Sequence, residues 1–316
     1  MESEAFVQLA LKTIAKSQKE LAALLAVSPT QISKWKRGEH MSTDMEEKFR
    51  SLTDIGDHDP RVVLWTGSVE AAIKWERLID RLAELAMESD ETGYITDPLT
   101  NPLGLLYWHT FYTLSQLGVH IPPAFPKELE ALVVDTELDD DIFSIIENNQ
   151  HASLIDQIFR SLTYVYGFYA AYIDDLIYDD ALDLIDTPAI NLEHNLMELA
   201  ASKVEPAARL APNFLQFKHQ VISEYRDWLT LVKDAAFRAG VPLRAELLNL
   251  LHDTPEELGQ TAEAEWLGFN STRLHPDIYM NELLVGMRVI HQVLPAILKK
   301  LDLEDEFTLD ETELHL

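Results

Sequence analysis

The sequence predicts an all-α protein. Only 11 of its 316 residues are glycine, and the alternating Val/Ile/Thr pattern that is typical of strands is hard to find. Apolar residues instead recur at spacings of three and four along most of the chain, which is the period of an amphipathic helix. Most prolines lie between these periodic segments, where a missing amide donor does least harm.

Acidic charge is concentrated in the later part of the chain. The formal net charge is −29, from 54 acidic and 25 basic residues. Residues 1–56 contain eight acidic and eight basic residues, so residues 57–316 carry the whole excess. Because an acidic surface repels phosphate, only the N-terminal part is electrostatically suited to DNA.

A segment rich in glycine, proline and polar residues, 55–60, is the predicted domain boundary. We expect a small N-terminal domain over 1–56 and a larger acidic, all-helical dimerisation or sensor domain over 57–301. The remainder, 302–316, mixes acids with Leu and Phe, and we expect a flexible acidic tail.

The helices expected in the larger domain follow the apolar periodicity. Ser68 is placed to cap the first of them, and Gly118 and Gly240 are placed to end two others. The expected ranges are 69–88, 103–117, 126–135, 139–149, 152–180, 190–204, 213–239, 243–252, 255–267 and 277–301.

Two helices joined by a short turn are expected between residues 17 and 37. Ser17 and Glu20 have the spacing of a capping box for the first helix, whose packed face contains Leu21, Ala22, Leu24 and Leu25. Ser28, Pro29 and Gln31 have the cap, first-position proline and capping-box spacing of the second. Ile32 and Trp35 face the first helix, which leaves a short, polar and basic outer face. Its residues are Thr30, Gln31, Lys34 and Ser33 at its margin.

This stretch resembles the Xre/Cro-type (lambda-repressor-like) helix-turn-helix family. The matching positions are Gln18, Leu21-Ala22, Leu25, Val27-Ser28, Ile32-Ser33, Trp35 and Gly38. The resemblance extends to a preceding helix over 4–15 and a following one over 42–52. It departs from the family at Ala26, where glycine is usual at a turn position that can need positive φ, and at Lys36, which replaces a common glutamate.

The resemblance implies a DNA-binding role for Gln18, Ser28, Thr30, Gln31, Ser33, Lys34, Lys36 and Arg37. Gln18 and the start of its helix would contact phosphate, and Ser33, Lys36 and Arg37 would hold the DNA backbone. Thr30, Gln31 and Lys34 would face the major groove of a double-stranded operator. Because such domains usually bind paired half-sites, the resemblance also implies a homodimer.

Candidates for catalysis are weak. The segment Tyr172-Ile-Asp-Asp175 has the order of a carboxylate metal motif, but 161–185 has the spacing of one continuous helix, so a solvated or partner-facing acidic face is the preferred interpretation. His194 and Glu198 have metal spacing, yet two ligands do not make a site. The chain has no cysteine, so thiolate chemistry is excluded. We expect no enzyme activity, no metal and no cofactor.

The preferred function is a transcriptional regulator that binds specific DNA, with the helical body setting oligomerisation or sensing a ligand. The alternative is a protein-interaction module, such as an antitoxin, anti-repressor or DNA mimic, acting through its acidic body. A third interpretation is a peptide-sensing regulator, on domain order alone. The acidic first residues and the lack of a long apolar run predict a cytoplasmic protein with no membrane segment.

Overall fold

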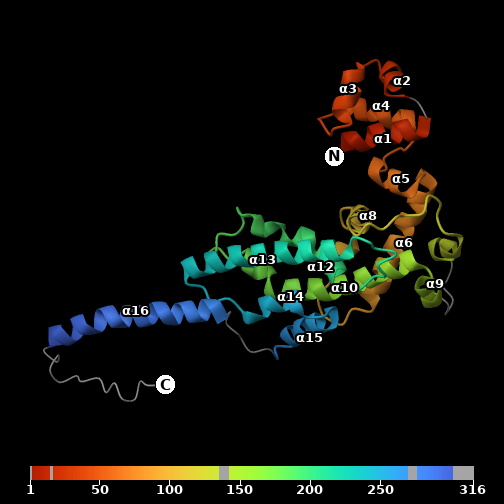
Figure 1. The fold of residues 1–316 in the computed structure, drawn as a ribbon. Coiled ribbons are helices and arrows are strands. Elements are labelled where there is room, and N and C mark those ends of the chain that lie inside the picture. Colours follow the sequence, from red (N-terminus) through yellow and green to blue (C-terminus); the bar gives the residue numbers. More distant parts are fainter. Residues whose placement is uncertain (1, 15–16, 135–141, 270–275, 302–316) are drawn as a thin grey trace.

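The computed structural model describes residues 2–14, 17–134, 142–269 and 276–301 (Figure 1). These residues form helices and irregular segments and contain no strand, as the sequence predicts. The expected acidic tail, 302–316, lies outside the described residues. The first helices form the N-terminal unit: α1 (Glu2–Ile14), α2 (Gln18–Leu24), α3 (Pro29–Trp35) and α4 (Thr43–Thr53).

The N-terminal unit has its own set of packed aromatic and aliphatic side chains. The rings of Phe6 and Phe49 are fully buried, with centroids 5.9 Å apart. Trp35 packs edge-on against Phe49 at 6.0 Å, and its indole Nε1 donates to the carbonyl of His40 at 3.1 Å. Trp35 therefore ties the end of α3 and the loop that follows it to the core of the unit.

A short helix, α5 (Pro60–Thr66), joins the N-terminal unit to the rest of the chain by packing against both α1 and α6. Before it, a guanidinium nitrogen of Arg50 donates to the carbonyls of Gly56 and His58, at 2.8 Å each. The segment that the sequence marks as a domain boundary is thus held to α4 by side-chain hydrogen bonds.

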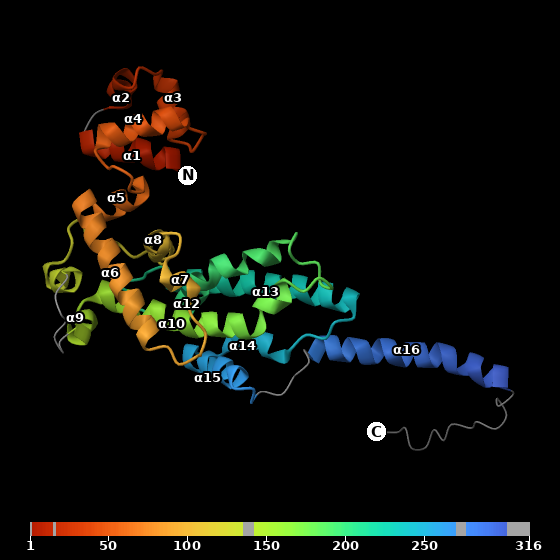
Figure 2. The same cartoon turned by 180° about the vertical axis from the view of Figure 1, so that it is seen from behind.

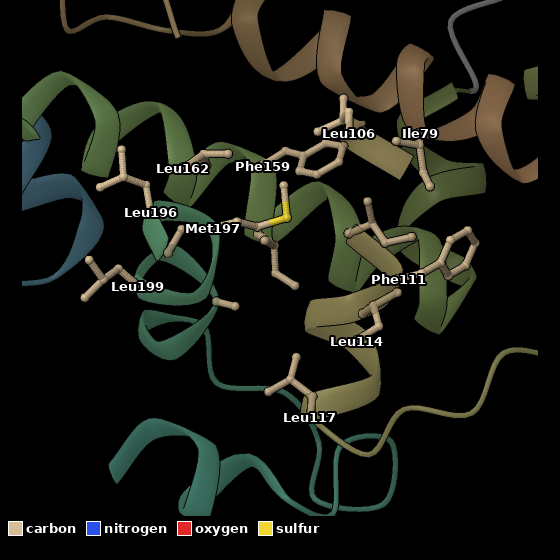
Figure 3. Packing of buried hydrophobic residues seen from close by; sticks show 14 of the residues in the cluster. Ile79, Leu106, Phe111, Leu114, Leu117, Phe159, Leu162, Leu196, Met197 and Leu199 are labelled. Carbon is tan, nitrogen blue, oxygen red and sulfur yellow. The ribbon is translucent and has the colours of Figure 1, made fainter. Parts of the chain in front are cut away.

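The body consists of the helices that follow α5, up to α15. Its central helix is α10, which contacts α6, α12 and α15. Figure 3 shows part of the buried cluster, where Phe159 and Leu162 of α10 lie near Met197 of α12. The helices are α6 (Val69–Glu88), α7 (Asp97–Thr100), α8 (Leu106–Gln116), η1 (Lys127–Val133), α9 (Ile142–Asn148), α10 (Gln150–Tyr172), α11 (Asp174–Ile177), η2 (Pro188–Asn195), α12 (Leu196–Lys203), α13 (Phe214–Ala239), η3 (Ala245–Leu248), α14 (Asn249–His252) and α15 (Pro255–Trp266).

Several expected helices need correction. The expected helix 152–180 is wrong as one continuous element, because it breaks at Ile173, where φ is −120° and α10 ends. The hydroxyl of Tyr169 donates to Asp174 at 3.1 Å beside this break. Segments expected as α-helix at 126–135 and at the start of 190–204 are 3₁₀ helices, which share the three-residue spacing of apolar side chains.

The last described helix, α16 (Pro276–Leu301), extends away from the body, as both views show (Figures 1 and 2). It contacts the body at α13. Within the described ranges, none of the helices, α16 included, combines the length and the apolar character that crossing a membrane requires.

Candidate nucleic-acid interface

The α2–α3 pair begins with the local structure that the sequence predicts. Ser17 Oγ accepts from the backbone amide of Glu20 at 3.3 Å, and the Glu20 carboxylate accepts from the Ser17 amide at 2.9 Å. This closed capping box satisfies two donors at the start of α2. At α3, Ser28 Oγ accepts from the Gln31 amide at 3.1 Å. The return bond from the Gln31 side chain is not formed among the described residues, so the second capping box is only half present.

The turn between α2 and α3 has the backbone conformation for which glycine is suited. Ala26 has φ of 55°, in the left-handed region that alanine rarely adopts. The Val27 amide nevertheless donates to the carbonyl of Ala22 at 2.9 Å and so closes the end of α2. Ala26 therefore adopts a strained backbone conformation in the turn that links the two helices.

Opposite sides of α3 have different environments. Ile32 is fully buried and Trp35 is 5% exposed, so this side of α3 is fixed in the core of the N-terminal unit. Thr30 is exposed, and Gln31 and Lys34 are partly exposed. A buried pair at spacing three thus orients the polar side chains of one short helix outward.

The remaining predicted residues lie around α3 with one exception. Ser33 is partly buried, and its hydroxyl donates back to the carbonyl of Pro29 at 3.1 Å. Lys36 is exposed just after α3, and the side chain of Arg37 is 70% exposed. Gln18 instead begins α2, where it is partly buried. Most of the residues predicted to bind DNA therefore lie on α3 or at one of its ends.

An acidic residue that the sequence analysis did not single out lies against the basic ones. Glu39 has one carboxylate oxygen 3.7 Å from Lys34 Nζ and the other 3.4 Å from a guanidinium nitrogen of Arg37. Glu39 comes directly after Gly38, whose φ of 84° turns the chain back toward α3. A glycine at this position is the one feature of the sequence that could have indicated the contact. Glu39 reduces the positive potential of this face.

The α2–α3 pair lies on the side of the N-terminal unit that faces away from the body (Figures 1 and 2). In both overall views, α2 and α3 are on the far side of α1 and α4, whereas α5 and the body are on the near side (Figures 1 and 2). The polar face of α3 is thus separated from the part of the chain that carries the acidic excess.

The carboxylates and histidines that the structure describes in the body were compared with the requirements of a metal site. No cluster of three or more His, Cys, Asp or Glu suited to a metal ion occurs in the described part of the chain. Tyr172 is engaged in packing, because the guanidinium of Arg244 lies 4.3 Å from its ring centroid and its hydroxyl donates to the Thr261 carbonyl at 3.2 Å. His194 lies in the last turn of η2, and Glu198 follows on α12.

The described part of the body contains cavities of moderate size, and two of them hold titratable side chains. One, of about 360 Å³, is lined by η2, α12 and α13 and includes Trp228 and Glu198. The other, of about 340 Å³, includes His109 and His194. Burial raises the pKa of Glu198 to about 7, and one of its carboxylate oxygens is buried without a hydrogen-bond partner among the described residues.

Comparison with known proteins finds no family model, no curated protein and no solved structure that matches this chain.

Proposed function

We propose that this protein is a sequence-specific DNA-binding regulator that reads its operator with α3. The observation that carries the proposal is the orientation of α3, in which buried Ile32 and Trp35 present Thr30, Gln31 and Lys34 outward. A short helix with one face fixed and a polar, basic face outward is the element that helix-turn-helix proteins insert into the major groove.

The outward side chains have suitable chemistry for reading bases. The amide of Gln31 can pair with both the N6 and N7 positions of adenine, and Lys34 can donate to the acceptors of guanine. Gln31 returns no bond to Ser28 in the described part of the chain, which leaves its amide available for a base. Base identity would be read at these two positions, with Thr30 in contact beside them.

Electrostatics restrict DNA to this end of the protein. Lys36 and Arg37 are exposed beside α3 and can hold the sugar-phosphate backbone. Residues 57–316 carry the net charge of −29 and repel the duplex. The small contact area that remains favours two copies on paired half-sites, because one unit neutralises few phosphates.

The direct experiment is fluorescence anisotropy of the full chain with duplexes from its own upstream DNA and with a random-sequence pool, across a range of salt. We expect sequence-dependent binding that weakens with salt. Gln31→Ala/Lys34→Ala should weaken it at least about tenfold, because one good base contact contributes 1–3 kcal/mol of discrimination.

The matched control is Gln216→Ala/Lys218→Ala on α13, which removes the same chemical groups from the body. It should bind as the wild type does. Non-specific affinity alone, from protein that remains folded, would contradict the proposal.

A second candidate function is favoured by one observation, the net charge of −29 on residues 57–316. Such a body can bind a basic protein partner, as an antitoxin, anti-repressor or DNA mimic would. The two functions are distinguished by the α3 variant, since a mimic has no use for Gln31 and Lys34. Retention of partner binding by Gln31→Ala/Lys34→Ala, with no DNA binding by the wild type, would favour this candidate.

A further inference from the structure

Helix α16 exposes large apolar side chains over most of its length. Their exposed fractions range from 43% to 65%, whereas soluble proteins rarely leave so many neighbouring apolar side chains in water. They are Leu283, Leu284, Val285, Met287, Val289, Ile290, Val293, Ile297 and Leu301.

The spacing of these residues is that of a helix-pairing seam. From Leu283 onward, apolar positions follow one another at alternating steps of four and three residues, as in the a and d positions of a heptad. These positions are Leu283, Met287, Ile290, Leu294, Ile297 and Leu301. Gln292 and Lys299 are exposed and lie on the opposite side of the helix from this seam. The seam is about 28 Å long at 1.5 Å per residue.

Charge indicates what covers the seam. Residues 283–301 contain no Asp or Glu, in a chain that has 54 of them. Residues 157–172 of α10 are also free of acids, and most of them are buried. Because two copies of a chain with net charge −29 repel each other, a contact between them is electrostatically least costly where acids are absent. An exposed, acid-free apolar helix satisfies that condition.

We propose that α16 pairs with α16 of a second copy of this chain and so forms a homodimer. Large apolar side chains are also exposed at the end of α15, where Trp266, Leu267 and Phe269 are 59%, 52% and 79% exposed. The argument for the dimer depends only on α16. The further statement that the dimer brings two α3 helices to one operator rests on the proposed function.

The test is sedimentation velocity of the full chain at micromolar concentration without DNA. The wild type is expected at twice the 36.0 kDa of one chain. Ile290→Glu places a charge in the seam and should raise the dimer dissociation constant at least about tenfold. Because Ile290 is 60% exposed in one copy, the substitution should not disturb the fold, and the far-UV circular dichroism of the variant should match that of the wild type. Gln292→Glu adds the same charge on the opposite side, so it should remain dimeric.

A monomeric wild type would overturn the inference, and so would an Ile290→Glu variant that dimerises as tightly as Gln292→Glu. A monomer that binds anionic vesicles would overturn it in favour of a lipid surface. The measurement contains no DNA, so a dimer that fails to bind any operator would contradict the proposed function alone.

Discussion

Lys34 and Glu39 form an ion pair across the turn that ends α3, with Nζ 3.7 Å from a carboxylate oxygen. The two side chains are 45% and 48% exposed. A pair exposed to this extent contributes little to folding stability, on the order of 0–1 kcal/mol. Its effect on ligands is larger, because Glu39 places a negative charge beside Lys34, which would read a base, and Arg37, which would hold the DNA backbone.

Replacement of Glu39 with glutamine should therefore strengthen DNA binding. We expect Glu39→Gln to raise affinity several-fold at low salt, with a smaller gain at high salt because exposed charges are screened. Anisotropy titrations of the wild type and the variant at two salt concentrations would measure this. The control is Glu84→Gln on α6, where Glu84 pairs with Arg81 at 2.7 Å, far from α3. If both variants gained the same DNA affinity, the net charge of the protein would explain the effect, and the position of Glu39 beside α3 would not.

The turn at Ala26 offers a stability test. Because Ala26 has φ of 55°, Ala26→Gly should relieve backbone strain and increase the free energy of unfolding by up to about 1 kcal/mol. Ala23, exposed inside α2, is the control, because Ala23→Gly should decrease it by about 1 kcal/mol. Urea unfolding followed by circular dichroism would compare them. A loss of stability in Ala26→Gly would contradict the conformation of this turn.

The raised pKa of Glu198 should make the free energy of unfolding depend on pH. Burial, with a smaller contribution from Glu224, raises its pKa to about 7 from the usual 4.5. The folded state therefore holds its proton more tightly than the unfolded state. This carboxyl destabilises the fold increasingly as pH rises from about 4.5 to about 7.

Glu198→Gln should remove this pH-dependent loss. At pH 8 the variant should be more stable than the wild type by up to about 3 kcal/mol, and near pH 4 the difference should be small. Thermal unfolding at both pH values would show it. Glu224→Gln, at an exposed position on α13, is the control and should change stability less. An equal difference between Glu198→Gln and wild type at both pH values would rule out titration of Glu198.

The sequence predicted elements whose ends have a strong local signal. Ser68 accepts from the Ala71 amide at 3.1 Å and begins α6, and Gly240, with φ of 69°, ends α13. The prediction from the sequence missed α5, although Asp59 caps that helix and Pro60 occupies its first position. There proline was interpreted as a joint, but the same residue also suits the start of a helix.

Other features could not be predicted because they depend on the direction in which the chain turns at one residue. The break at Ile173 lies in a run of apolar spacing that continues through it, and Tyr169 and Asp174 meet only in the folded chain. For α3, Ser28, Ile32 and Trp35 were enough to predict which side is buried. The approach of Glu39 to Lys34 depends on the turn at Gly38, and spacing alone did not reveal it.

The most direct test of the central claim is the ratio of two affinities, for a duplex selected from a random pool and for the same duplex with its bases scrambled. We expect a ratio of at least about 10³ for the wild type, as specific DNA-binding proteins show. Gln31→Ala should lower the ratio roughly 5- to 150-fold, since a lost base contact removes 1–3 kcal/mol of discrimination. Its affinity for the scrambled duplex should stay the same. A wild-type ratio near one, or an undiminished ratio in Gln31→Ala, would contradict sequence reading by α3.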